Sequence, residues 1–190
     1  MVRNSISTKL GDSGETSLLY GGRVAKSSRR VKASGIGDEA VSALGMARAL
    51  CNSDFIHDAL LENQRLMFLA NAELTTDTAH LDELREHFQT IGKEHVDDLD
   101  ALLRRLENEV ELPRAFIIPG ASQRSAALDL ARCKVRDLER AAVALFDDGL
   151  MRNEQLLVWL NRLSDCIFMM ARYVDRDLPT EIVTGTRREN

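Results

Sequence analysis

The stretch that decides the fold runs from residue 155 to residue 174 and reads QLLVWLNRLSDCIFMMARYV. Its apolar side chains recur every three or four positions, at Leu156, Leu160, Leu163, Ile167, Met170 and Val174. This spacing places them on one face of an α-helix, whereas a half-buried strand would need strict alternation. The stretch therefore predicts a long helix whose apolar face lies in a core.

Four more segments have the same helical period and lie at residues 38–50, 54–74, about 80–110 and about 122–148. Gly92 predicts a bend in the third of them, and Pro113 predicts its end. Five amphipathic helices with mostly short joints predict an all-α fold, a five-helix up-and-down bundle with an extra crossover. We expect residues 38–177 to form this bundle, with a glycine-rich loop segment at 1–37 and a polar, frayed tail at 178–190.

The composition indicates one globular domain of 190 residues with 44% hydrophobic content and a net charge of −5. The longest uninterrupted apolar runs have six residues, far below the roughly 20 that a membrane-spanning helix needs. The amino terminus lacks the apolar core of a secretory signal, so we expect a cytoplasmic protein with no membrane partner. Cys51, Cys133 and Cys166 are widely spaced, and we expect buried free thiols.

Charge is distributed unevenly along the chain. Residues 1–35 carry seven basic and two acidic side chains, a net charge of +5, so the remainder carries −10. An acidic body would repel a nucleic acid beyond a short contact, so we expect no nucleic-acid partner. A small anionic ligand fits this distribution better.

Several familiar sites are absent from the sequence. The first segment contains no G-x-x-x-x-G-K-[ST] and no strand-preceded G-x-G-x-x-G, which excludes Walker and Rossmann chemistry. No histidine has a glutamate three residues before it, so the di-iron bundle signature is missing. We interpret His57, His80, His87 and His95 as exposed or capping residues.

Two cationic segments could hold a polyanion. The first reads TKLGDSGETS over residues 8–17 and is followed by Arg23 and Lys26, so glycine N–H groups, hydroxyls and amines lie close together. The second is the stripe Arg132, Arg136 and Arg140, whose guanidinium groups share one helix face. From the residues alone, a triphosphate cradle and a flexible solvated arm remain open for the first, and a ligand site and a solvated face for the second.

Five separated blocks give this sequence a resemblance to the PduO-type ATP:cob(I)alamin adenosyltransferases between about residues 8 and 173. The first block, TKLGDSGETS at 8–17, is similar to the family's T-K-T-G-D-K-G-x-[ST]-[ST] loop. The second, GIGDE at 35–39, is similar to its G-T-x-D-E-L block. FIIPG at 116–120 is similar to F-[IV]-L-P-G-G, and residues 132–140 are similar to R-x-x-x-R-R-x-E-R. LNRLSD at 160–165, with Phe168 and Arg172 after it, matches L-N-R-L-S-D-x-x-F-x-x-A-R.

The resemblance implies a trimer that binds ATP between subunits beside a corrinoid and transfers the 5′-deoxyadenosyl group to cob(I)alamin, releasing triphosphate. It implies that magnesium accompanies ATP, that a flavin or flavoprotein reductase supplies the electron, and that a B12-dependent enzyme takes the product. It places the triphosphate at Thr8, Lys9, Leu10, Gly11, Thr16, Ser17 and Lys26, and the nucleotide contacts of the helix side at Arg136, Asp137, Glu139, Arg140 and Asn161. It pairs Arg132 with Asp38 across the subunit contact and places Phe116 on the lower face of the corrin.

Three residues depart from the family pattern at positions where the resemblance implies a contact with phosphate. Leu10 and Ser13 replace a threonine and a lysine in the loop, and Asp137 replaces an arginine and inverts a charge. Gly37, Ala40, Val41 and Ala121 are further departures. These changes leave two alternatives to the enzyme: a non-catalytic protein that binds ATP, a corrinoid or another tetrapyrrole as carrier or sensor, and a purely structural bundle.

Overall fold

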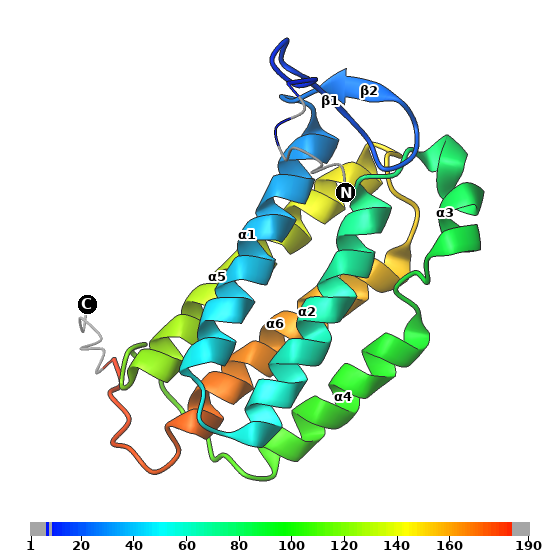
Figure 1. The fold of residues 1–190 in the computed structure, drawn as a ribbon. Helices are drawn as coiled ribbons and strands as arrows, with labels where there is room; N and C mark the ends of the chain where they lie inside the picture. The colour runs from blue at the N-terminus through cyan, green and yellow to red at the C-terminus, as the bar shows by residue number, and fades with distance from the viewer. Residues whose placement is uncertain (1–6, 8, 184–190) are drawn as a thin grey trace, which may run out of the picture.

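The computed structural model describes residues 7 and 9–183, and this part of the chain forms a helical bundle with a small hairpin at one end (Figure 1). The hairpin consists of strands β1 (Glu15–Ser17) and β2 (Arg23–Ala25). The helices that follow are α1 (Arg29–Leu50), α2 (Asp54–Leu74), the 3₁₀ turn η1 (Thr78–His80), α3 (Leu81–His87), α4 (Lys93–Glu107), α5 (Gln123–Asp147) and α6 (Glu154–Val174). The five long helices confirm the predicted all-α bundle, and α3 is a short addition beside it.

Helix α5 lies between α1 and α6 and runs antiparallel to both (Figure 1). Three contacts fix its register on α1: Arg29 with Asp148 at one end, Lys134 with Glu39 in the middle, and Arg124 with Asn52 at the other end. Helix α2 packs against α1, and α4 packs against α6.

Helix α6 confirms the periodicity of its sequence. Leu156, Leu160, Leu163, Ile167 and Met170 are fully buried, and burying each such side chain stabilises the fold by about 1.5–3 kcal/mol. Trp159 is fully buried as well. The helix begins after Asn153, whose side-chain oxygen accepts a hydrogen bond from the backbone N–H of Gln155 at 3.0 Å.

The prediction that the first helix begins at residue 38 is wrong. Helix α1 begins at Arg29, after Ser28 caps it by accepting a hydrogen bond from the N–H of Val31. The buried residues of α1 are mostly small, namely Ala33, Gly37, Ala40, Leu44 and Ala47, with Arg30 before them. Small and charged residues give a weak apolar period, so the first turns of the helix are hard to see in the sequence.

The single helix predicted over residues 80–110 is divided into α3 and α4. The chain between them is extended because its backbone bonds to other elements: the N–H of Ile91 donates to Glu73 Oε1 at 2.7 Å, and Asn153 Nδ2 donates to the carbonyl of Ile91 at 2.9 Å. Gly92 then caps α4. The predicted bend is thus a complete break.

The prediction of a frayed tail over residues 178–190 is wrong for the described part of it, while residues 184–190 lie outside the described residues. Residues 181–183 pair with residues 116–118 through an antiparallel bridge between Ile117 and Ile182. All three cysteines are free, as predicted, but only Cys166 is buried, and burial raises the pKa of its thiol to about 12. In the described part of the chain, no helix is long and apolar enough to cross a membrane.

Candidate functional site

The segment before β1, residues 9–14, has a conformation that its own backbone hydrogen bonds define; we call this segment, together with Lys26 just after β2, the hairpin loop. Lys9 has a φ of 58° and Gly14 a φ of 86°, and the N–H of Gly14 donates to the carbonyl of Gly11 at 3.2 Å. The N–H of Lys26 donates to the carbonyl of Gly14 at 2.9 Å, and Arg23 Nη2 donates to the carbonyl of Leu10 at 2.8 Å. These bonds tie the loop to the start of β1 and to β2, and they define the course of its backbone.

The amines of Lys9 and Lys26 in the hairpin loop have no carboxylate partner among the described residues. Within residues 9–183, neither Lys9 nor Lys26 forms an ion pair, while Arg23 lies 3.4 Å from Glu15. Lys26 lies directly against Gly11, because a Cβ built on that glycine would be 2.9 Å from Lys26 Nζ. Gly11 therefore leaves the space that the amine occupies, and both lysines are available to an anion.

The two predicted hydroxyls of β1 do not lie together. Thr16 and Ser17 are consecutive residues of a strand, so their side chains leave opposite faces of the hairpin. Thr16 is half-buried and Ser17 is exposed. Thr8 lies outside the described residues.

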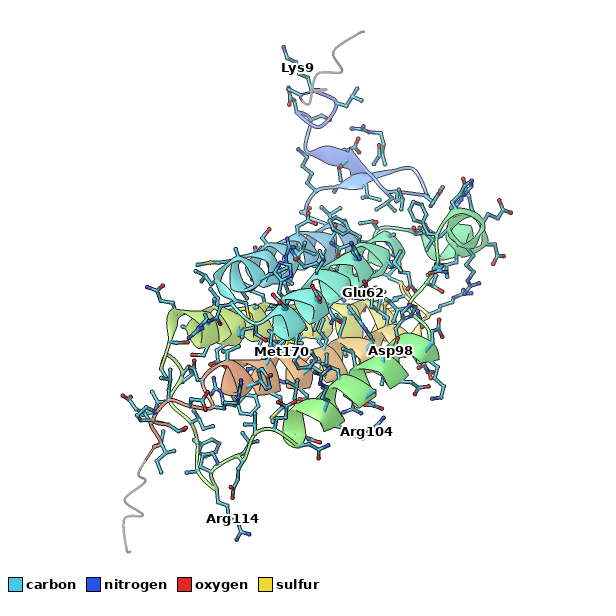
Figure 2. All side chains as sticks on the ribbon, turned by 60° about the horizontal axis from the view of Figure 1, so that its bottom comes forward. Lys9, Glu62, Asp98, Arg104, Arg114 and Met170 are labelled. Carbon is cyan, nitrogen blue, oxygen red and sulfur yellow. The ribbon has the colours of Figure 1, made fainter. Side chains whose placement is uncertain are left out.

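The other end of the hairpin is attached to the bundle. The N–H of Leu19 donates to the carbonyl of Thr75 at 3.0 Å, and the N–H of Asp77 donates to the carbonyl of Tyr20 at 2.9 Å. Tyr20 also stacks on His87 of α3, with 6.1 Å between ring centroids. The hairpin loop consequently extends away from the helices, with Lys9 at its outer end (Figure 2).

The second cationic region, which we call the α5–α6 face, comprises Arg132, Arg136, Asp137, Glu139 and Arg140 of α5 with Asn161 of α6. Arg140 forms an ion pair with Asp137, and Asn161 Nδ2 donates to Glu139 Oε1 at 2.8 Å. Arg136 is exposed and forms neither an ion pair nor a side-chain hydrogen bond within the described residues. One guanidinium of this face is therefore free, and another already has an anion beside it.

Arg132 lies at the more buried end of the α5–α6 face. Its guanidinium carbon lies 5.8 Å from the centre of the Phe168 ring, and its Nε lies 3.9 Å from Asp129 Oδ1. Asp129 is itself buried and paired with the buried Arg172. The Nε of Arg132 is buried without a hydrogen-bond partner within the described residues, so this guanidinium has donors left for another group.

Asp38 lies on α1 and does not meet Arg132 in one chain. Its exposed carboxylate accepts a hydrogen bond from Asn71 Nδ2 of α2 at 3.1 Å, whereas Arg132 faces α6. Within residues 9–183, no cation pairs with Asp38. The predicted partners thus lie on two different faces of the bundle.

Phe116 lies at the end of the molecule opposite the hairpin. Its side chain is 85% exposed, and its carbonyl accepts a hydrogen bond from the N–H of Val183 at 2.8 Å. A cavity of about 190 Å³ lies behind this pairing and is lined in part by Leu112, Ile117, Ile118 and Arg172. The labelled Arg114, two residues before Phe116, and Lys9 lie at opposite ends of the molecule (Figure 2). Helix α5, which runs between these ends, has 25 residues and is about 37 Å long.

Within one chain, the predicted site residues therefore lie in separate groups. Lys9, Leu10, Gly11 and Lys26 form the first, and the residues of the α5–α6 face form the second. Phe116 belongs to neither. The sequence interpretation did not select Asn71 or the segment 181–183, although Asn71 is a polar residue beside the buried Ala70 and Leu74, which is an available signal.

A model of the cobalamin adenosyltransferase family matches residues 6–174 of this sequence. The chain belongs to this family. A corrinoid adenosyltransferase from Citrobacter freundii is 36% identical over 167 residues, covering 88% of this chain and 93% of that protein. The corrinoid adenosyltransferase PduO of Salmonella typhimurium is 36% identical over 174 residues, and the chain spans 50% of its length.

The solved structures agree with this membership. A variant of a PduO-type ATP:corrinoid adenosyltransferase from Lactobacillus reuteri, complexed with cobalamin and ATP, superposes with a TM-score of 0.85 at 30% identity. The alignment covers 95% of this chain and 97% of that one. The bundle and the hairpin are therefore those of a corrinoid adenosyltransferase.

Proposed function

We propose that this protein transfers the 5′-deoxyadenosyl group of ATP to cob(I)alamin, giving adenosylcobalamin and inorganic triphosphate. The observation that carries the proposal is the pair of cationic regions, the hairpin loop and the α5–α6 face, in a chain that matches the family over residues 6–174. Cobalt(I) is the nucleophile, so the protein needs no general base. A cobalt–carbon bond forms at carbon 5′ while the bond from carbon 5′ to oxygen breaks, and its electron pair leaves with triphosphate.

The residues of this chain then have two tasks, to orient carbon 5′ and to stabilise the charge of the leaving triphosphate. On the loop side, we assign the triphosphate to Thr8, Lys9, Leu10, Gly11, Thr16, Ser17 and Lys26. Among the described residues, the amines of Lys9 and Lys26 have no carboxylate partner, which supports this assignment because no carboxylate must be displaced. On the helix side, we assign the nucleotide to Arg136, Asp137, Glu139, Arg140 and Asn161.

We propose that the site forms between two copies of the chain. Within the described residues of one copy, no cation pairs with the carboxylate of Asp38, and on a different face the partly exposed side chain of Arg132 forms no hydrogen bond and reaches only Asp129, at 3.9 Å. Two complementary but different faces make a head-to-tail contact, and such contacts give closed rings when the rotation closes. A homotrimer in which Asp38 of one copy pairs with Arg132 of the next satisfies both groups.

Magnesium accompanies ATP in this proposal and would neutralise part of the phosphate charge. Within the described residues, no group of three or more His, Cys, Asp or Glu side chains is arranged to hold a metal ion. Mg²⁺ in nucleotide sites is held largely by phosphate oxygens and water, with one or two protein oxygens. The hydroxyls of Thr16 or Ser17 fit that small requirement.

Phe116 provides the contact for the second substrate. An exposed aromatic ring beside the apolar residues Ile117 and Ile118 suits the lower face of a flat macrocycle. Such a contact would exclude the axial base from cobalt and ease reduction of cobalt(II). A flavin or flavoprotein reductase would supply that electron, and a B12-dependent enzyme would receive the product.

A second candidate is a non-catalytic carrier or sensor that binds ATP and a corrinoid. The ion pair between Asp137 and Arg140 favours it, because it places a carboxylate in the nucleotide region. The test is incubation of the protein with ATP, magnesium and chemically reduced cobalamin while the visible absorption is followed. We expect the spectrum of adenosylcobalamin, whereas binding of both ligands without that spectrum would support the carrier.

A further inference from the structure

The carboxylate of Asp38 is held by a single side chain. Asn71 Nδ2 donates to Asp38 Oδ1 at 3.1 Å, and this bond joins α2 to α1. The next residue, Glu39, is also exposed but forms an ion pair with Lys134 of α5 in the same chain. Asp38 is thus oriented without being neutralised, and Glu39 is neutralised.

The side chain of Asn71 is itself held in place because it is buried and packs against Gly37. Its side chain is 9% exposed, and its Oδ1 is buried without a hydrogen-bond partner within the described residues. A Cβ built on Gly37 would overlap this oxygen and lie 2.7 Å from Asn71 Cγ. The amide therefore occupies the space left by the missing side chain of Gly37. A carboxylate only accepts hydrogen bonds, so the NH₂ group must face Asp38.

We propose that Asn71 is the positioning residue of the subunit contact: it holds Asp38 ready for Arg132 of a neighbouring copy, and Gly37 provides the space for its amide. The inference rests on the proposed function, which assigns Asp38 to that contact. An exposed carboxylate loses side-chain freedom when it forms an ion pair, and this entropy opposes association. A hydrogen bond that already fixes the rotamer in the single chain removes part of that opposition.

The first test is Asn71→Ala, compared with Asn63→Ala in the full chain. Asn63 is a matched control because it is also a buried asparagine of α2 whose Oδ1 has no hydrogen-bond partner among the described residues. In that part of the chain its Nδ2 donates only to the carbonyl of Ala59, at 2.8 Å. Sedimentation velocity over a concentration series measures assembly. We expect Asn71→Ala to weaken association about tenfold and Asn63→Ala to leave it within about twofold of wild type.

The second test asks whether Asn71 acts through Asp38. In an Asp38→Asn background, the same Asn71→Ala change should weaken association no further, since the carboxylate that it positions is gone. Activity at low protein concentration should fall with association and return when the concentration is raised. A loss that persists in the Asp38→Asn background, or that high concentration does not restore, would show that Asn71 only supports folding and would overturn the inference.

The third test changes Gly37 and uses Gly35 as its control. Both glycines belong to α1, but a Cβ on Gly35 would meet nothing within 4 Å. Alanine favours the helix at either position, so Gly35→Ala should raise the melting temperature and leave association unchanged. Gly37→Ala should displace the amide and weaken association about as much as Asn71→Ala. Equal behaviour of the two alanine variants would contradict the assigned role of Gly37.

The outcomes separate this inference from the proposed function. A wild-type protein that assembles and forms adenosylcobalamin, with Asn71→Ala indistinguishable from Asn63→Ala, would overturn the inference alone. A wild-type protein that assembles but gives no cobalt–carbon bond would overturn the enzymatic proposal and leave the assembly tests valid. A wild-type protein that stays monomeric at every concentration would overturn both.

Discussion

The hairpin loop and the α5–α6 face both present cations, but they differ in what surrounds those cations. In the hairpin loop, backbone bonds fix the shape, and Lys9 and Lys26 have no carboxylate within the described residues. On the α5–α6 face, Arg140 is paired with Asp137, and Asn161 is bound to Glu139. We therefore expect a polyphosphate to bind the hairpin loop directly. On the α5–α6 face it would find the unpaired guanidinium of Arg136 and would compete with Asp137 for that of Arg140.

The largest expected effect comes from removing the free guanidinium. Arg136→Ala should lower kcat/KM by about 100-fold, because an unpaired guanidinium gives its full charge-assisted hydrogen bonds to the leaving triphosphate. Arg140→Ala is the matched variant and should cost about tenfold less, since Asp137 already offsets its charge. Steady-state kinetics with cob(I)alamin and ATP measure both. Equal losses would mean that the ion pair does not distinguish the two arginines.

Phe116 lies apart from both cationic regions, and its removal should leave ATP binding intact. Phe116→Ala should lower transfer about tenfold when cobalt(II) must be reduced on the protein, and much less with pre-formed cobalt(I), because the ring acts on the axial face of cobalt. Parallel assays with the two oxidation states, together with an ATP titration, check this. Equal losses in the two assays would refute the axial role.

A smaller effect should follow when Arg140 is released from its partner. Asp137→Asn removes the carboxylate and should tighten ATP binding about threefold, the range of an exposed ion pair. Calorimetric titration at two salt concentrations measures the change, and Asp147→Asn at the end of α5 is the control. Weaker ATP binding in Asp137→Asn would indicate that the carboxylate assists the nucleotide or its cation.

The smallest expected effect is a pH dependence of the stability that arises from Glu73, near the end of α2 to which the hairpin is attached. The buried carboxylate of Glu73, near the end of α2 that holds the hairpin, has a pKa raised from its ordinary 4.5, mainly by desolvation. The folded state therefore retains a proton that the unfolded state has lost, so stability falls as the pH rises from 4.5 through the raised pKa. Thermal unfolding across this window should show the fall, and Glu73→Gln should flatten it. The exposed Glu86→Gln should keep the wild-type pH dependence.

The sequence predicted the parts of the fold in which one strong apolar period spans the element. Leu156, Leu160 and Leu163 of α6 illustrate this, because a buried face with a period of 3.6 has few alternative structures. The start of α1 was missed because Arg30 and Gly37 are among its buried residues. The break before α4 depends on Glu73 and Asn153, which approach Ile91 only in the folded chain.

The candidate site was predictable as a set of residue types and not as an arrangement. The loop, the arginine stripe and Phe116 each have a local pattern, so they could be selected from the sequence. Local patterns do not reveal that Lys9 and Arg114, two residues before Phe116, lie at opposite ends of the molecule (Figure 2), or that Asp38 and Arg132 face different neighbours. Asn71 was missed because its role depends on Gly37, in another helix.

In the proposed site between two copies, we expect one copy to supply the hairpin loop and the next copy to supply the α5–α6 face. The most direct test mixes Lys26→Ala protein with Arg136→Ala protein, each nearly inactive alone, and allows the subunits to exchange. In a ring of head-to-tail contacts, random exchange leaves about a quarter of the sites with an intact loop and an intact face. We predict that the mixture regains about a quarter of wild-type activity. A mixture that stays as inactive as its components would contradict the claim.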